Sequence, residues 1–329
     1  MDRITFIVLL LVAVGCVTTG RSSLAKLPHE KGSKTPAVQV DMRNVMYHFT
    51  DQVAVHVLQL HGLVLPTQRE RLPAFDDVQS FMFAIHFAEI AIGTDALSNV
   101  LNQYVFAAPD APIKDVVVTT VGNSVKVHGK LHAKGDIPFE TEGTAVATPE
   151  GHIRIHTHKV SVVQVSVKGL MDLLGLKIAQ LINTDKVRGL RLEGNDLILD
   201  PALLLPLPRI TGRVTEVQVQ GDHILQVFGT RPPASATSPH SGNYMAYRGA
   251  AQLRFGKLTM SDTDLVLIDM DPQDPFDFSL EHYKEQLVAG YTKITPDFGL
   301  RVFMRDFNKV HQPSPRRDAL SRQPAAPQR

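Results

Sequence analysis

The sequence has no tryptophan, a single cysteine and few charged residues. Cys16 is the only cysteine and lies in the N-terminal leader, so a chain without that leader would have no disulfide and no thiol chemistry. Charged residues make up 20% of the 329 residues, and the formal net charge is +1. A nearly neutral chain has no overall field that would attract nucleic acid, and we therefore expect no nucleic-acid partner.

Signatures of familiar enzymes are also missing. The sequence contains no G-x-S-x-G nucleophile elbow, no H-E-x-x-H zinc motif, no phosphate-binding P-loop and no dinucleotide-binding glycine pattern. These absences favour a binding protein over an enzyme. We expect no catalytic residue, no cofactor and no bound metal.

The first twenty residues have the pattern of an export signal. Residues 4–14 form an apolar run that is too short to span a membrane, and Arg3 precedes it. The sequence A-V-G-C at residues 13–16 approximates a lipoprotein signal box, in which Cys16 would be acylated. Ordinary cleavage near Gly20 would instead remove Cys16, and both interpretations stay open. We expect an extracytoplasmic protein of the periplasm, anchored to the outer membrane if Cys16 carries lipid.

Composition divides the remaining chain. We expect a disordered tether over residues 21–36, a β-rich lipid-binding domain over 37–229, and a disordered basic tail over 311–329. The Pro/Ser-rich stretch 230–243 either divides two domains or decorates one. We take residues 244–310 as a hairpin and helix that extend the same domain.

The segment 170–182 predicts a short amphipathic helix with a wide apolar arc. An arc of this width needs cover from protein or from lipid. Lys177 lies within it, and either its ammonium reaches water while its stem covers apolar surface, or it contacts an anionic head group. The predicted acyl-contacting residues on this arc are Leu170, Leu174, Ile178 and Leu181.

The stretch 79–92 predicts a strand that is apolar on both faces. Half-solvated antiparallel strands alternate apolar with polar residues, so this one must be sandwiched or must line an apolar space. By simple alternation, Phe81, Phe83 and Phe87 share one face, and we expect them to form a wall of that space. A helix is predicted to follow from Thr94.

Two further strands, 124–133 and 137–148, predict a hairpin with a charged face. Lys126 and His128 project to the same side of the first strand, and Glu140 and Glu142 project together from the second. If the strands pair, the carboxylates neutralise the basic side chains across the ladder.

His152, His156 and His158 share a face of the next strand with Arg154. A transition metal needs such convergence, but no cysteine or carboxylate completes a tetrahedral set nearby in the sequence, and Arg154 repels a cation. A solvated sheet face is the favoured interpretation.

Residues 262–277 are rich in aspartate. Pro272 and Pro275 interrupt the run, and the order of residues in a calcium-binding loop is missing, so Asp-Pro surface turns are favoured over a calcium site. A pair of these acids could also serve glycoside hydrolysis. The acids concerned are Asp262, Asp264, Asp269, Asp271, Asp274 and Asp277.

Several apolar and turn patterns resemble a known family. They are V-K-G-L-M-D-L-L-G-L at 167–176, V-R-G-L at 187–190, N-D-L-I-L-D-P at 195–201, and G-R-V-T at 212–215. Together with V-Q-V at 217–219 and G-D at 221–222 they resemble bacterial LmeA-like secreted phospholipid-binding proteins, which are related in fold to tubular lipid-binding (TULIP) domains. The resemblance covers about residues 113–229.

The resemblance implies an α+β, mostly β fold: a strongly curved antiparallel sheet wrapped around one or two amphipathic helices, with an apolar groove. It implies non-enzymatic binding or transfer of phospholipid or another acyl lipid in the bacterial cell envelope. Two alternatives stay open. One is an envelope scaffold with a filled core that binds a protein partner through a sheet edge. The other is a carboxylate-dependent hydrolase of envelope polymers.

Overall fold

The computed structural model describes residues 37–111, 113–132, 136–162, 189–194, 196–232 and 241–310. All of them belong to one compact unit, Pro36–Arg329, and the other unit, Met1–Thr35, lies outside the described residues. Strands dominate the described part, which confirms the mostly β prediction. No helix in these described ranges has the length and hydrophobicity needed to cross a membrane.

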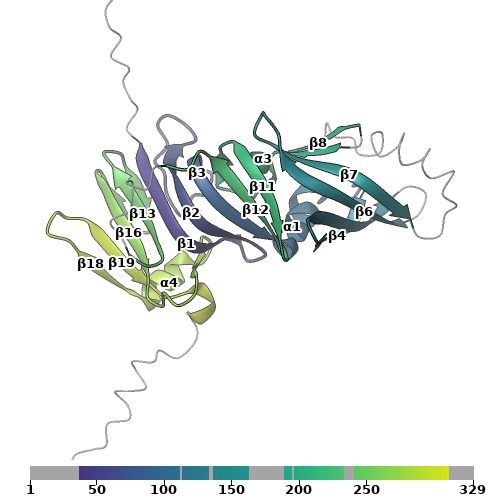
Figure 1. Ribbon diagram of the computed structural model, residues 1–329. Coiled ribbons are helices and arrows are strands. Elements are labelled where there is room, and N and C mark those ends of the chain that lie inside the picture. Colours follow the sequence, from purple (N-terminus) through teal and green to yellow (C-terminus); the bar gives the residue numbers. More distant parts are fainter. Residues whose placement is uncertain are drawn as a thin grey trace, which may run out of the picture. The chain divides into compact units, whose positions relative to one another are not determined.

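The larger sheet has eleven strands and is built on a meander of three long ones (Figure 1). Its path runs β11-β12-β3-β2-β1-β13-β16-β19-β18, while β10 pairs with β3 and β17 with β1. The strands are β1 (Val38–Thr50), β2 (Val53–Pro66), β3 (Phe81–Gly93), β10 (Arg209–Thr211), β11 (Val214–Gln220), β12 (His223–Gly229), β13 (Tyr244–Gly249), β16 (Thr263–Asp269), β17 (Phe276–Ser279), β18 (Tyr291–Ile294) and β19 (Leu300–Met304). Because β13 pairs with β1, five of the strands after residue 243, namely β13, β16, β17, β18 and β19, continue this sheet.

The smaller sheet has six strands in the order β4-β5-β6-β7-β9-β8, and every pairing in it is antiparallel. Its strands are β4 (Ile113–Val121), β5 (Ser124–His132), β6 (Asp136–Ala147), β7 (Ile153–Val162), β8 (Leu190–Glu193) and β9 (Asp196–Leu199). A separate hairpin joins β14 (Leu253–Phe255) to β15 (Leu258–Met260).

The predicted hairpin over 124–148 forms as β5 and β6. His128 lies opposite Glu140 and Lys126 opposite Glu142 in the register. The Lys126 ammonium also reaches Glu140 diagonally, with an N–O distance of 2.7 Å. The expected neutralisation of the basic side by carboxylates across the ladder is therefore confirmed.

Short helices connect the strands. The predicted helix after Thr94 is confirmed as α1 (Thr94–Val100), which continues into the π-helical turn η1 (Leu101–Val105). It packs against β4 of the smaller sheet and against β2 and β3 of the larger one. The remaining helices are α3 (Pro201–Leu204), α4 (Tyr283–Ala289) and the 3-10 turn η3 (Phe307–Lys309).

One apolar core includes residues of both sheets. At the β13 end, Phe75 is the centre of an aromatic cluster, although it lies in the connection between β2 and β3. Its ring lies 5.4 Å from that of Tyr247, 5.1 Å from Phe255 and 5.7 Å from Tyr283. Burial of several aromatic side chains makes this end a filled core.

Candidate functional site

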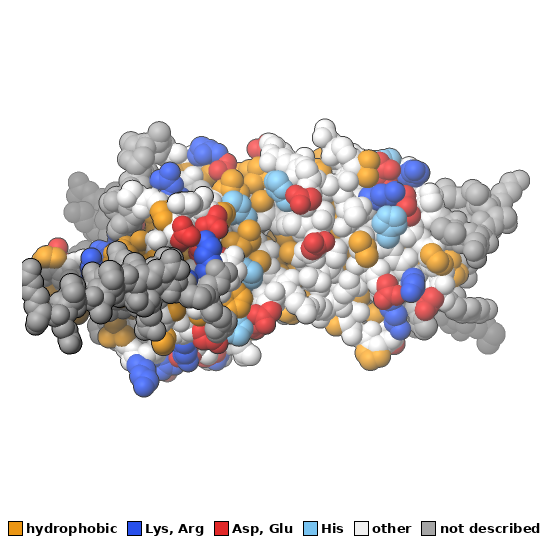
Figure 2. Space-filling view, turned by 90° about the horizontal axis from the view of Figure 1, so that it is seen from below, with side chains coloured by type: hydrophobic (Ala, Val, Ile, Leu, Met, Phe, Trp, Pro, Cys, Tyr) orange, Lys and Arg blue, Asp and Glu red, His pale blue; other side chains and the backbone are white. Residues whose placement is uncertain are grey.

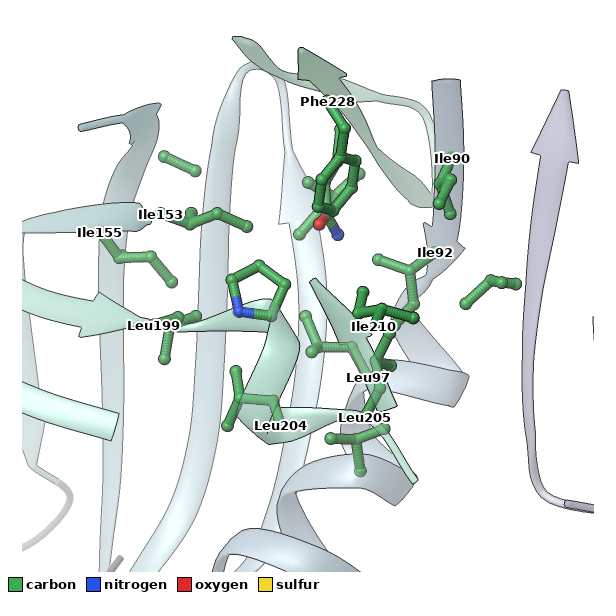
Figure 3. Close-up of a pocket in the computed structure, with 16 residues that line it drawn as sticks. Ile90, Ile92, Leu97, Ile153, Ile155, Leu199, Leu204, Leu205, Ile210 and Phe228 are labelled. Atoms are coloured by element: carbon green, nitrogen blue, oxygen red, sulfur yellow. The ribbon is translucent and has the colours of Figure 1, made fainter. Parts of the chain in front are cut away.

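An apolar cavity lies where the two sheets meet (Figure 3). Its volume is about 50 Å³, and Gln226 is the only polar residue among the sixteen that line it. The lining residues are Val55, Ile90, Ile92, Leu97, Val100, Ala145, Ile153, Ile155, Leu199, Pro201, Leu204, Leu205, Ile210, Ile224, Gln226 and Phe228. We call this the inner cavity. Such a lining can accept only an apolar group, because a polar group there would lose its hydrogen bonds to water.

Strand alternation explains how separate segments build this lining. Side chains at every second position of a strand point to the same face, so β3 contributes Ile90 and Ile92 and β7 contributes Ile153 and Ile155. On β12 the positions 224, 226 and 228 follow the same rule. The inner cavity is therefore bounded by the larger sheet on one side and by the smaller sheet on the other.

The third wall comes from α3 and the residue after it. The Asp200 side chain accepts a hydrogen bond of 3.0 Å from the backbone N–H of Ala202, and Pro201 occupies the first turn. This local cap fixes the start of the short helix. As a result Leu204 and Leu205 lie against the inner cavity.

A second, larger cavity adjoins α3. Its volume is about 380 Å³, and Leu204 and Leu205 belong to its wall as well as to that of the inner cavity. We call it the outer cavity. Its other lining residues are Phe49, Thr50, Val78, Tyr104, Val105, Leu203, Pro206, Leu207, Arg209 and Glu281. Site volumes for small molecules run from about 300 to 1,000 Å³, so the outer cavity alone is of ligand size.

The wall of the outer cavity contains several polar residues, whereas that of the inner cavity contains one, Gln226. Arg209 is exposed, and it forms no ion pair within the described part of the chain. Thr50 contributes a hydroxyl that is buried and has no hydrogen-bond partner there. Tyr104 and Leu203 are 42% and 40% exposed, so the wall also presents apolar surface to solvent. The outer cavity thus offers an apolar surface together with one cation, Arg209, and one acid, Glu281, neither of which forms an ion pair within the described ranges.

The predicted phenylalanine wall does not line either cavity. Phe81 and Phe83 are buried in the core, where the Phe81 ring lies 5.5 Å from that of Phe83 and 6.0 Å from that of Phe75. Phe83 in turn lies 6.2 Å from Tyr47. These two phenylalanines contact protein side chains.

Phe87 points to the opposite face of the sheet, so the prediction that it shares a face with Phe81 and Phe83 is wrong. Gly62 of β2 pairs with Ile85 of β3, whereas the adjacent His61 pairs with Phe87, so one residue of β3 is extra at this point. Such a bulge reverses the facing of every later residue. Accordingly Phe87 stacks on His61 at a centroid distance of 6.3 Å. No feature of the sequence alone marked this bulge.

The remaining predicted lipid contacts lie outside the described residues. They are Leu170, Leu174, Lys177, Ile178 and Leu181 of the expected amphipathic helix, together with Cys16, the expected lipidation site. The segment that carries the helix connects β7 to β8, and β7 lines the inner cavity.

The histidines of β7 are paired with carboxylates. His156 lies 2.6 Å from Asp196, and His158 lies 3.7 Å from Glu142. These carboxylates are distant in sequence, and the neighbouring strands β6 and β9 bring them to β7 from its two sides. Arg154 shares Asp196 with His156, which neutralises the charge of this face. In the view of Figure 2, acidic, basic and histidine side chains are likewise interspersed on the surface.

Most of the acids of residues 262–277 form ion pairs or hydrogen bonds with other parts of the chain. Arg301 binds Asp264 with two N–O distances of 3.0 Å, and Lys309 binds both Asp271 and Asp274. The Asn243 amide donates to Asp269, at 2.8 Å. Burial raises the pKa of Asp269 to about 6. His48 lies 2.6 Å from Asp277.

No protein-family model, curated protein or solved structure is significantly similar to this chain.

Proposed function

We propose that the protein binds phospholipid, or another acyl lipid, without catalysing a reaction, in the bacterial cell envelope. The observation that carries this proposal is the apolar inner cavity between the two sheets and its shared wall with the outer cavity. One cavity has the chemistry of hydrocarbon and the other has the size of a ligand site.

The two volumes suggest how an acyl chain would be accommodated. The inner cavity, at about 50 Å³, is too small for a whole chain, whereas the outer cavity has about 380 Å³. We infer that the chain enters the outer cavity and displaces the side chains of Leu204 and Leu205, which opens the way into the inner cavity. Each methylene removed from water contributes roughly 0.8 kcal/mol, so a few carbon atoms give useful affinity.

Arg209 supports an anionic head group as the polar end of the ligand. Arg209 lines the outer cavity and forms no ion pair in the described ranges, and Glu281 is the one acid in the same wall. Arginine binds phosphate through two parallel charge-assisted hydrogen bonds. A phospholipid with its phosphate at Arg209 and its acyl chain behind Leu204 would pair the cation and cover the apolar wall.

The sequence supports the envelope setting. An export signal over residues 1–20 and acylation of Cys16 would place the chain outside the cytoplasm, and the patterns at 167–222 resemble LmeA-like proteins. The finer prediction, a TULIP-like sheet wrapped around amphipathic helices, belongs to this proposal.

Analysis of bound lipid tests the proposal. The protein is purified without detergent, its lipids are extracted and identified by mass spectrometry, and uptake of a fluorescent phospholipid is measured. Ala145→Leu places extra carbon atoms in the inner cavity and is expected to reduce uptake at least several-fold. Ala147→Leu is the matched control, because residue 147 lies two positions along on the same strand and does not line the cavity. Absence of lipid and equal uptake by both variants would contradict the proposal.

A scaffold that binds a protein partner is the second candidate, and the edge of the larger sheet favours it. All four residues of the edge strand β18 are exposed, and Ile294 is 73% exposed. Phe298, in the turn between β18 and β19, is 91% exposed. Exposed edges and apolar side chains are typical of pairing surfaces. If this candidate is right, Phe298→Ser abolishes capture of the partner. Neither the unaltered protein nor this variant then takes up phospholipid.

A further inference from the structure

Two groups of side chains in the described part converge closely enough to hold a metal ion. The first comprises Asp271, Asp274 and Asp306, and the second comprises Asp51, Glu281 and His282. In each group, one ligand atom per residue lies within 4.8 Å of the others. The two groups differ in what balances their charge.

The first group already contains its own cation. The Lys309 ammonium lies 2.8 Å from Asp271, 3.1 Å from Asp274 and 2.9 Å from Asp306. Hydrogen bonds to these carboxylates, that to Asp271 first, raise the pKa of Lys309. Because an ammonium ion occupies the point of convergence, this group needs no metal.

The second group has no lysine or arginine, and its one basic side chain is His282 itself, whose two ring nitrogens face Asp51 and Glu285. A metal ion bound here would replace the proton on Nε2. No lysine or arginine within the described ranges pairs with Asp51 or Glu281, and Lys284, the nearest lysine in sequence, binds Asp76 at 2.8 Å. We propose that Asp51, Glu281 and His282 bind a divalent transition-metal ion such as Zn²⁺. This site does not depend on lipid binding.

The imidazole of His282 is oriented as in known metal sites. Its Nε2 faces Asp51, at 3.1 Å, while its Nδ1 lies 3.2 Å from Glu285. In metalloproteins the ring nitrogen that does not bind the metal commonly donates to a carboxylate, which fixes the tautomer and the ring. The His282 ring also stacks on Phe307, with centroids 5.0 Å apart and an interplanar angle of 14°.

Both segments that carry the ligands are anchored. Asp51 lies in the β1–β2 turn, where the side chain of Asn99 donates to the Gln52 carbonyl at 2.9 Å. The backbone N–H of His282 donates to the Ser279 hydroxyl at 3.2 Å. The backbone positions are therefore set before a metal arrives, and only the side chains need to move.

One nitrogen and two carboxylate oxygens suit a borderline metal ion such as Zn²⁺ better than Ca²⁺ or Mg²⁺, which prefer oxygen alone. At metal–ligand distances of about 2.0–2.2 Å, the ligand atoms of a tetrahedral site lie about 3.4 Å apart. The 3.1 Å between Asp51 and His282 is close to this spacing, and Asp51, whose side chain is 63% exposed, has room to adjust. Three protein ligands leave a coordination position open, and Glu281 also lines the outer cavity.

Titration of chelator-treated protein with ZnCl₂ tests this site by calorimetry, with the visible absorption of bound Co²⁺ as a second readout. We expect one ion per chain. His282→Ala and Asp51→Asn should each abolish the one-ion binding, and Glu285→Gln should weaken it about 10–100-fold, because it removes the group that orients His282.

His156→Ala is the matched control, because His156 also faces a carboxylate, Asp196, but belongs to the smaller sheet. It should leave affinity and stoichiometry unchanged. Two results would overturn the proposal: no stoichiometric binding to the unaltered protein, or the same loss in His156→Ala as in His282→Ala. Asp51→Asn removes a charge from an exposed turn, so its effect can be read even if His282→Ala fails to fold.

Discussion

Leu204 and Leu205 are shared by the walls of the inner and the outer cavity. Leu204 is 6% exposed and ends α3, and Leu205 is its C-cap residue. A helix of four residues has little stability of its own, so packing and the Asp200 cap hold it in place. Entry of an acyl chain into the inner cavity requires these two side chains to move.

Leu204→Ala should join the two cavities. Removal of a buried leucine costs about 2–5 kcal/mol of unfolding free energy, and phospholipid uptake should become faster because the barrier between the cavities is smaller. Leu258→Ala, at a position that is 47% exposed and lines neither cavity, is the control and should alter neither quantity appreciably. Denaturant unfolding and stopped-flow uptake of a fluorescent lipid measure the two effects. Slower uptake by Leu204→Ala would argue against this route.

Two glycines on β12 and its hairpin should respond differently to alanine. Gly221 and Gly229 have φ values of +61° and +64°, but a Cβ at Gly221 meets no atom within 4 Å, whereas one at Gly229 meets the His86 carbonyl oxygen. Gly221→Ala should therefore cost only the backbone strain, about 1–2 kcal/mol. Gly229→Ala should cost more than about 3 kcal/mol. Chemical denaturation measures the two losses of unfolding free energy. Equal losses would show that β12 does not approach β3 as closely at Gly229 as described.

Gln286 should be an essential polar residue of the core. It is fully buried; its side-chain amide donates at 2.8 Å to the carbonyls of Asp277 and Arg305, and its oxygen accepts from the Ser279 N–H at 2.9 Å. Gln286→Leu leaves these backbone groups without partners and should cost about 3 kcal/mol or more. Thermal unfolding measures the loss. A cost below about 1 kcal/mol would mean that water or another group replaces the amide.

Stability should depend on pH through Asp269. Burial raises its pKa in the folded protein from 3.8 to about 6. Protonated Asp269 therefore contributes its full stabilisation of the folded state below pH 3.8. This stabilisation is lost as pH rises through about 6. The loss is at most roughly 3 kcal/mol.

The test of this dependence compares the unfolding free energy of the protein and of Asp269→Asn between pH 4 and pH 7. The difference in unfolding free energy between the protein and the variant should change across this window, because the variant has no titrating group at this position. A constant difference would contradict the raised pKa of Asp269.

Periodicity predicted the elements better than the contacts between them. The strand β3, the β5–β6 hairpin and the helix from Thr94 follow from local sequence patterns. These signals are local, so the sequence carries them directly. The charged pairs across β5 and β6 follow in the same way once the strands pair. The side-chain cap expected at the start of the helix from Thr94 does not form, because its N-cap residue is Gly93.

What the sequence could not show depends on register and on distant chain segments. The bulge opposite His61 turns Phe87 away from Phe83, and nothing in the sequence indicates it. The inner cavity combines Ile92, Ile155 and Leu205, which belong to three separate regions of the chain. The site of Asp51 with His282 joins residues separated by 231 positions. Such contacts are set by the tertiary fold.

Photocrosslinking with a phospholipid that carries a diazirine on its acyl chain tests whether that chain enters the inner cavity. If it does, mass spectrometry finds the label on residues of the inner cavity, Ile92, Leu199 or Leu205 among them. Ala145→Leu then reduces this labelling, while Ala147→Leu does not. Labelling confined to exposed residues such as Ile294 and Phe298, or none at all, would contradict entry of the chain into this cavity.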